Sequence, residues 1–225
     1  MPVWIWRAIT EDIRLASVSS PVRRPKDMWW YIRAVMFVLA CIPFVLMVLG
    51  VVQNNLGPDP ARTLAQDTGR WTLRLMLASL AITPLRELLK LVGLAPLRRT
   101  LGLFALFYAC VHFVVYILFL LEMRWSEIGS DILERPYITV GFVALLILVA
   151  MGVTSPKSMV RKMGRRWKPL HQLIYVAIIL ALMHLIWILR TDVFDAFLYG
   201  GIAAVLLGYR LFKHLSKKFS KALAR

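Results

Sequence analysis

The sequence predicts an all-α integral membrane protein, a bundle of six transmembrane helices with both termini in the cytoplasm. Three observations support this fold class. Apolar side chains make up 60% of the 225 residues, and the mean hydropathy is +0.68. These residues gather into runs of about 20, the length of helix that crosses a hydrocarbon core of about 30 Å. Basic residues concentrate on alternate connections between the runs.

Six apolar runs follow one another along the chain. Each is interpreted as a transmembrane helix, because a backbone in lipid must satisfy its own hydrogen bonds. The runs cover residues 32–53, 72–92, 101–123, 137–154, 170–190 and 194–212. The predicted organisation is an N-terminal cytoplasmic extension (1–29), one transmembrane domain (30–213) and a basic cytoplasmic tail (214–225).

The net charge of +16 is distributed unevenly, and its distribution predicts the orientation. Four segments hold 22 Lys and Arg against 4 Asp and Glu: 1–33, 85–100, 155–169 and 210–225. The alternate connections hold the remaining 6 basic residues against 8 acidic ones. This alternation follows the positive-inside rule and places both termini in the cytoplasm. The basic charge is therefore interpreted as an orientation signal and a contact for anionic lipid, not as a nucleic-acid site.

The N-terminal segment carries no cleavable secretory signal, because the first apolar run begins only near residue 32 and is too long for such a signal. Residues 1–20 are open to two interpretations, an interfacial helix and a disordered tail. Cys41 and Cys110 fall in different predicted helices and are interpreted as small core residues. No C-x-x-C-H sequence occurs, so covalent c-type haem attachment is not expected.

Three of the four histidines lie in or at the ends of the third and fifth predicted helices, namely His112, His171 and His184. His214, in the basic tail, is expected to be solvated. Ionisable side chains in a transmembrane helix indicate a functional site by default. His112 lies about 17 Å and His184 about 21 Å along their outward-running helices, so both are expected in the outer half of the bilayer. His171 is expected at the cytoplasmic edge.

Each of the two outer histidines ends a stripe of small residues at helical spacing. The stripes are Gly102, Ala105 and Ala109 before His112, and Ala177 and Ala181 before His184. Small residues on one helix face leave room for a flat group between two helices. Close helix–helix packing uses the same residues, but it does not require a histidine at the end of each stripe.

Haem fits this pair of imidazoles better than zinc does. Zinc sites need three or four nitrogen or sulfur ligands, whereas haem iron takes two axial imidazoles and its apolar ring suits a bilayer. The haem propionates need cations, for which Arg70 and Arg74 are candidates. Arg98 and Arg99 are candidates for a group near the inner face. All four arginines are also interpretable as ordinary helix-flanking residues.

A second cofactor site at His171 is less well specified. Thirteen residues separate His171 from His184, which places their side chains about 140° apart on an ideal helix. Fourteen residues before His112 stands Arg98, so no second axial ligand is found there. We therefore predict one bis-histidine haem, with a second as an option. Three roles stay open for His171, next to Tyr175: a second haem, contact with a flavin or quinone, or a hydrogen bond.

Several short motifs, in this order and spacing, resemble the MsrQ family, haem-binding membrane subunits of the bacterial periplasmic methionine sulfoxide reductase system with a ferric-reductase-like transmembrane domain. The motifs are GPDP (57–60), TGRW (68–71), ITPLR (82–86), RRTLGL (98–103), RPYITVG (135–141) and WKPLHQLIY (167–175). The resemblance covers roughly residues 30–213.

This resemblance implies b-type haem in the inner membrane of a bacterium, with the three membrane histidines at the family's positions. It further implies a periplasmic molybdenum-containing catalytic partner that reduces methionine sulfoxide in damaged envelope proteins. Quinol is the implied electron source, and FMN is associated with the family. No residue of the sequence locates the FMN.

The residues themselves predict an electron-transfer subunit without a sulfoxide-reducing site. About 13 residues follow the last predicted helix and no dinucleotide-binding fingerprint occurs, so electrons are expected from quinol or from a separate cytoplasmic flavin reductase on the basic inner face. A haem in the outer half predicts delivery to an acceptor outside. Two alternatives are a proton-coupled transporter using buried histidines and a haem-free membrane anchor for a soluble enzyme. The predicted helices place no carboxylate at the depth of the histidines, which disfavours the transporter.

Overall fold

The computed structural model describes residues 25–90, 92–188 and 194–223, which form helices joined by short connections. The interpretations of residues 1–20 lie outside the described residues. The longer helices are α2 (Pro25–Val52), α3 (Pro60–Leu88), α4 (Ala95–Val115), α6 (Pro136–Val153), α9 (Ile174–Ile188) and α10 (Phe194–Leu223). The shorter ones are η1 (Val92–Leu94), the π-helical turn η2 (Tyr116–Leu120), η3 (Trp125–Glu127), α5 (Ile128–Glu134), α7 (Lys157–Met163), η4 (Gly164–Arg166) and α8 (Trp167–Gln172).

Five helical stretches in the described part of the chain are long and apolar enough to cross a membrane. They are Met28–Val52, Ala95–Leu120, Pro136–Val153, Lys157–Ile188 and Phe194–Ser216. The predicted span 72–92 forms most of α3, but Arg70, Arg74, Arg86 and Glu87 leave its apolar stretch short. The all-α membrane fold is therefore present, whereas the count of six spans and the cytoplasmic termini stay predictions.

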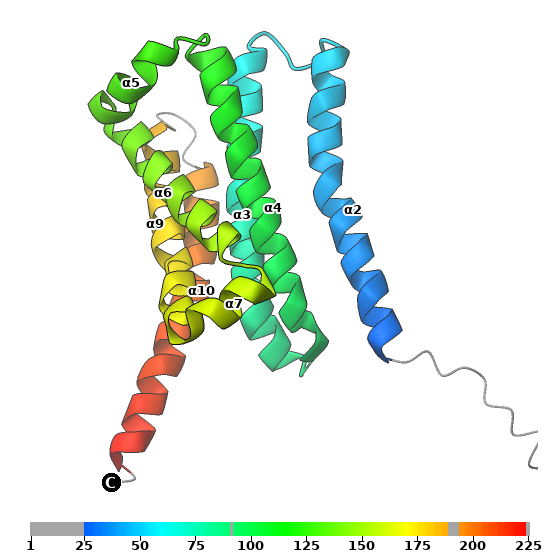
Figure 1. Cartoon of the computed structure of the whole chain (residues 1–225), viewed down its shortest axis with the longest axis vertical. Helices are drawn as coiled ribbons and strands as arrows, with labels where there is room; N and C mark the ends of the chain where they lie inside the picture. The colour runs from blue at the N-terminus through cyan, green and yellow to red at the C-terminus, as the bar shows by residue number, and fades with distance from the viewer. Residues whose placement is uncertain (1–24, 91, 189–193, 224–225) are drawn as a thin grey trace, which may run out of the picture. The chain divides into compact units, whose positions relative to one another are not determined.

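Helix α3 is a buried helix of the bundle. It begins sharply because the Asp59 side chain accepts a hydrogen bond from the Arg62 backbone N–H at 3.0 Å and Pro60 occupies its first turn. Met76 and Leu80 on α3 are each only 1% exposed. Helix α3 packs mainly on α4, α6 packs mainly on α9, and α10 lies beside α3 and α9 (Figure 1).

The side chain of Tyr108 on α4 hydrogen-bonds two backbone groups of α2 beside Pro43. Pro43 lies inside α2, and next to it the Phe44 N–H donates to the Tyr108 hydroxyl at 3.0 Å. The same hydroxyl donates to the Ala40 carbonyl at 2.7 Å. The side chain of Tyr108 thus bridges two backbone groups that a regular helix would pair directly, and it is fully buried.

The chain divides into a unit ending at Met36 and a unit beginning at Phe37, and the site described below lies within the second unit.

The fifth predicted span is not one continuous helix. Leu173 separates α8 from α9, so His171 and His184 belong to two helices. Leu173 itself keeps helical dihedral angles (φ −62°, ψ −11°), so the angle of about 140° between the two side chains stays a prediction.

Candidate functional site

The imidazole rings of His112 on α4 and His184 on α9 lie opposite each other. Their ring centroids are 6.0 Å apart, and the ring planes cross at 88°. Both side chains are partly buried. The two histidines are 72 residues apart in sequence, and the packing of the bundle brings their rings together.

One nitrogen of each ring is held by a backbone carbonyl. Nδ1 of His112 lies 2.9 Å from the carbonyl oxygen of Ala65, and Nδ1 of His184 lies 2.6 Å from that of Tyr137. A carbonyl only accepts, so each Nδ1 carries the proton that it donates. Each Nε2 is then an unprotonated nitrogen with a lone pair for a metal. Metal-binding histidines commonly donate their second ring N–H in this way.

Thr68 adds a third group to the surroundings of His112. Its hydroxyl lies 3.2 Å from Nδ1 and donates to the Leu64 carbonyl at 2.7 Å, so its lone pair faces the imidazole. Thr68 is only 1% exposed. Together with the carbonyl of Ala65, it fixes the orientation of the His112 ring from α3.

A glycine on a neighbouring helix lies against each imidazole. A Cβ atom on Gly141 of α6 would come within 2.7 Å of Nδ1 of His184. A Cβ atom on Gly69 of α3 would lie 3.3 Å from Cε1 of His112. Any side chain at these positions would press on a histidine ring, so both sites favour glycine for lack of space.

A cavity of about 670 Å³ contains the histidine pair and is lined by α3, α4, α5, α6 and α9. Met76 and Leu148 belong to its apolar part, whereas its charged mouth is lined by arginines of α3 and of the segments flanking α5, with the carboxylates of Glu127 and Asp131. Known ligand sites span about 300–1,000 Å³. The cavity therefore suits a flat, mainly apolar molecule with charged groups at one edge.

Haem meets these conditions. Two metal–imidazole bonds of about 2 Å each, plus the distance from each nitrogen to its ring centre, give a separation close to that of the two rings. Within the described residues, no group of three or more His, Cys, Asp and Glu side chains could hold a metal ion. The pair thus matches the two-nitrogen axial ligation of haem rather than the ligand set of a structural zinc.

The small-residue stripes divide into two roles. Ala109 and Ala181 line the cavity, each one turn from its histidine. Ala105 and Ala177 are fully buried outside the cavity lining, where they allow close helix packing. A Cβ atom on Gly102 would meet no atom within 4 Å, so this position faces open space.

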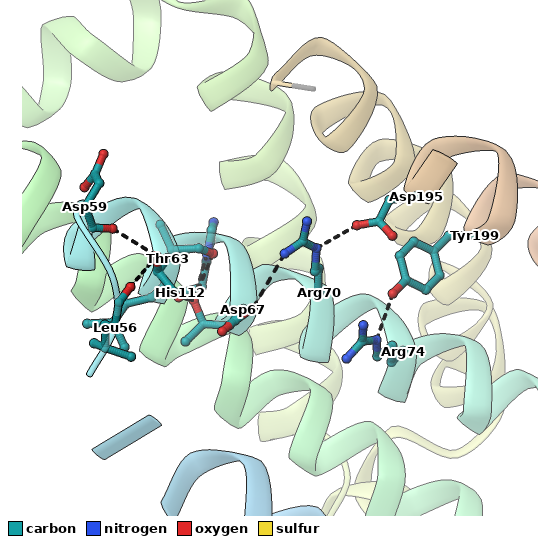
Figure 2. A network of polar contacts seen from close by, with 12 residues as sticks. Leu56, Asp59, Thr63, Asp67, Arg70, Arg74, His112, Asp195 and Tyr199 are labelled. Carbon is teal, nitrogen blue, oxygen red and sulfur yellow. Dashed lines mark hydrogen bonds and ion pairs between the residues drawn. The ribbon is translucent and has the colours of Figure 1, made fainter. Parts of the chain in front are cut away.

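The arginines expected near the propionates occupy different environments (Figure 2). Arg70 lines the cavity and donates to Asp195 of α10 at 2.6 Å. Arg74 is not among the lining residues, and its guanidinium donates to the Tyr199 hydroxyl at 2.8 Å and lies over the Trp71 ring. Both side chains attach α3 to α10, and only Arg70 is also placed at the cavity.

His171 lies apart from the histidine pair. Its Nε2 is 3.1 Å from the Thr154 hydroxyl, and its ring stacks on Trp167 at 4.0 Å. The Trp167 indole donates to the Thr154 carbonyl at 2.9 Å. This arrangement matches the hydrogen-bonding option for His171 and leaves its cofactor role as a prediction.

The remaining predicted inner residues do not meet in one cavity. Arg98 and Arg99 have exposed side chains, and the Arg98 carbonyl accepts from Ser79 at 3.1 Å. The ring of Tyr175 lies 5.8 Å beneath the guanidinium of Arg210, a residue that the sequence did not single out. The side chain of Arg98 nevertheless lies close enough to His171 and to Arg210 to interact electrostatically with both.

The sequence analysis missed the groups that support the histidines. Gly69 and Thr68 belong to the TGRW motif, and Tyr137 and Gly141 belong to RPYITVG. Those two motifs contain the only sequence signal for these roles. Ala65 and Tyr137 act through their backbone carbonyls, which every residue has, so their identity in the sequence does not indicate this role.

Comparison with known proteins agrees with this site. The model of the ferric reductase like transmembrane component family matches residues 68–182, a range that includes His112 and His171 and ends two residues before His184. A protein of Xanthomonas oryzae pv. oryzae (strain MAFF 311018), named as the protein-methionine-sulfoxide reductase heme-binding subunit MsrQ, is 46% identical over 169 residues, which is 75% of this chain and 78% of the relative. A protein of the same name from Herminiimonas arsenicoxydans is 40% identical over 184 residues, covering 80% and 84%.

Proposed function

The chain belongs to the MsrQ family of heme-binding subunits, within the ferric-reductase-like transmembrane proteins, and from this premise we propose that it holds one b-type haem between His112 and His184. It is a multi-pass bacterial membrane protein and an electron-transfer subunit. The observation that supports the proposed ligands best is the matching orientation of the two rings. Each is fixed through Nδ1 by a backbone carbonyl, with Nε2 available.

The bound haem supplies a one-electron redox centre. The residues around it bind, orient and shield it. Ala65, Thr68 and Tyr137 hold the imidazoles in one tautomer and increase their basicity. Gly69 and Gly141 let α3 and α6 approach the rings. The apolar part of the cavity, which includes Met76 and Leu148, limits the access of water.

In the proposed function, electrons enter from quinol or from a separate cytoplasmic flavin reductase and leave to a periplasmic, molybdenum-containing methionine sulfoxide reductase catalytic subunit. FMN is proposed as an associated cofactor, and an inner group at His171 is proposed as a step between donor and haem. These proposals rest on the family and on the basic segments, such as α7, which carries Lys157, Arg161 and Lys162. The same charge pattern supports cytoplasmic termini.

Visible spectroscopy of the purified full-length chain tests this proposal. Protein from haem-replete cells should show a Soret band that shifts on reduction with dithionite. The reduced protein should reoxidise on addition of the purified catalytic subunit with methionine sulfoxide. A colourless preparation would contradict haem binding and favour the haem-free anchor. A reduced haem that the catalytic subunit leaves unoxidised would contradict the proposed partner.

A further inference from the structure

The mouth of the cavity carries more positive charge than its own carboxylates neutralise. Four arginines line it, two from α3 and two from the segments flanking α5. Three of them pair with a carboxylate: Arg70 with Asp195 at 2.6 Å, Arg124 with Glu127 at 2.7 Å, and Arg135 with Asp131 at 2.8 Å.

Arg62 is the fourth arginine, and its environment differs. Only its backbone N–H is engaged by a carboxylate, that of Asp59. Its guanidinium pairs with no acidic side chain anywhere in residues 25–90, 92–188 and 194–223. Arg62 also lies in the first turn of α3, where the helix dipole disfavours a cation. An unneutralised cation at such a position, on the wall of a cavity, is suited to bind an anionic group.

The register of α3 connects Arg62 to the histidine site. Arg62, Ala65, Gln66 and Gly69 all line the cavity, and their spacing of three to four residues places them on one helix face. Gly69 lies against the His112 ring, whose Nδ1 is held by Ala65. Seven residues of helix, about 10 Å, separate Gly69 from Arg62. A haem ligated by His112 carries its two carboxylates on flexible arms at one edge, within reach of that position.

We propose that Arg62 binds a haem propionate, so that the carboxylate edge of the haem occupies the polar mouth and the opposite edge occupies the apolar part of the cavity. This inference rests on the proposed function, because it requires a haem between His112 and His184. It assigns to Arg62 a role that the sequence suggested for Arg70 and Arg74. Both of those guanidiniums already have partners within the protein.

The rate of haem loss to excess apomyoglobin tests the proposal in full-length protein in detergent. Arg62→Gln should keep the wild-type spectrum but release haem about tenfold faster, the lower end of what a hydrogen bond to a charged group contributes. Arg62→Lys, which keeps the charge, should release it at an intermediate rate. The matched control is Arg161→Gln on α7, an exposed arginine outside the cavity, which should behave as wild type.

A second arm changes the ligand instead of the protein. Haem dimethyl ester has no free carboxylate, so wild type and Arg62→Gln reconstituted with it should lose it at equal rates. A persistent difference with the ester would overturn the proposal, because Arg62 would then act without a propionate. Equal rates with natural haem would overturn it as well. The midpoint potential of Arg62→Gln should fall, since a lost cation destabilises the reduced, less positive haem. A failure of the proposed function would look different from a failure of this proposal, because the wild-type protein itself would then contain no haem.

Discussion

A Cβ atom at residue 141 would lie 2.7 Å from Nδ1 of His184, so the imidazole keeps its place only because Gly141 has no side chain. The Tyr137 carbonyl, one turn earlier on α6, holds that same nitrogen at 2.6 Å. Helix α6 therefore supplies both the space and the hydrogen bond that orient His184.

Gly141→Ala is expected to displace the His184 ring and weaken haem binding. The new methyl group overlaps the imidazole, and overpacking of this kind typically costs about 1–3 kcal/mol. The ratio of haem to protein should fall, and the low-spin spectrum should be perturbed. Gly69→Ala should have a smaller effect, because its Cβ would lie 3.3 Å from the His112 ring.

Gly102→Ala on α4 is the matched control, since a Cβ there meets no atom within 4 Å. It should retain full haem and gain slightly in helix stability. If Gly141→Ala instead keeps wild-type haem content, spectrum and melting temperature, the contact between Gly141 and His184 has no role in ligation.

Thr68→Val is expected to raise the midpoint potential of the haem without removing it. The Thr68 hydroxyl accepts from the His112 imidazole at 3.2 Å, which makes the ring a stronger donor to ferric iron. Valine has a similar shape and lacks that acceptor, so the ferric form loses stabilisation. A spectroscopic redox titration measures the shift, with Thr63→Val as control, because Thr63 lies on α3 outside the cavity lining and its hydroxyl donates to the carbonyls of Leu56 and Asp59. A lower or unchanged potential would exclude this role.

His171→Ala is expected to keep the haem at His112 and His184, because His171 contacts Thr154 and Trp167 outside that cavity. If His171 serves an inner cofactor, reduction by the donor should slow while dithionite still reduces the remaining haem fully. Stopped-flow measurement with quinol and with a flavin reductase separates the two steps. Unchanged rates with each donor would leave His171 with only its hydrogen bond.

The apolar runs predicted where the long helices lie, because a hydrocarbon solvent imposes length and composition on each span. The match is close for α6 (Pro136–Val153), whereas α3 begins at Pro60, twelve residues before its predicted span. That the rings of His112 and His184 lie near each other, 6.0 Å apart, was also predictable, since helical rise converts sequence position into height along each helix. The break at Leu173 and the short helix α5 were not, because local packing decides them. The partners of the arginines were not predictable either. Arg70 and Arg74 pair with Asp195 and Tyr199, 125 residues away in sequence.

Removal of acidic charge from the predicted outer surface is expected to slow delivery of electrons to the external acceptor. Glu122 and Glu134 are exposed near α5, beside the cavity mouth. The variant Glu122→Gln/Glu134→Gln should show slower oxidation by the catalytic subunit, with haem reduction by the donor unchanged. Lys157→Gln on α7 should instead slow haem reduction by the donor and leave oxidation by the catalytic subunit unchanged. Vesicles of known orientation with a membrane-impermeant acceptor provide the assay. Oxidation only from the cytoplasmic face would show that the direction is reversed.

Electron paramagnetic resonance of oxidised wild type, His112→Ala and His184→Ala tests the central claim most directly, because it reports the axial ligands of ferric haem. The wild type should give a low-spin signal typical of two imidazoles. Each single variant should lose that signal, through loss of haem or conversion to a high-spin form. Pyridine haemochrome assays of the same samples give the haem content. A bis-imidazole low-spin signal of wild-type intensity in both variants would contradict ligation by His112 and His184.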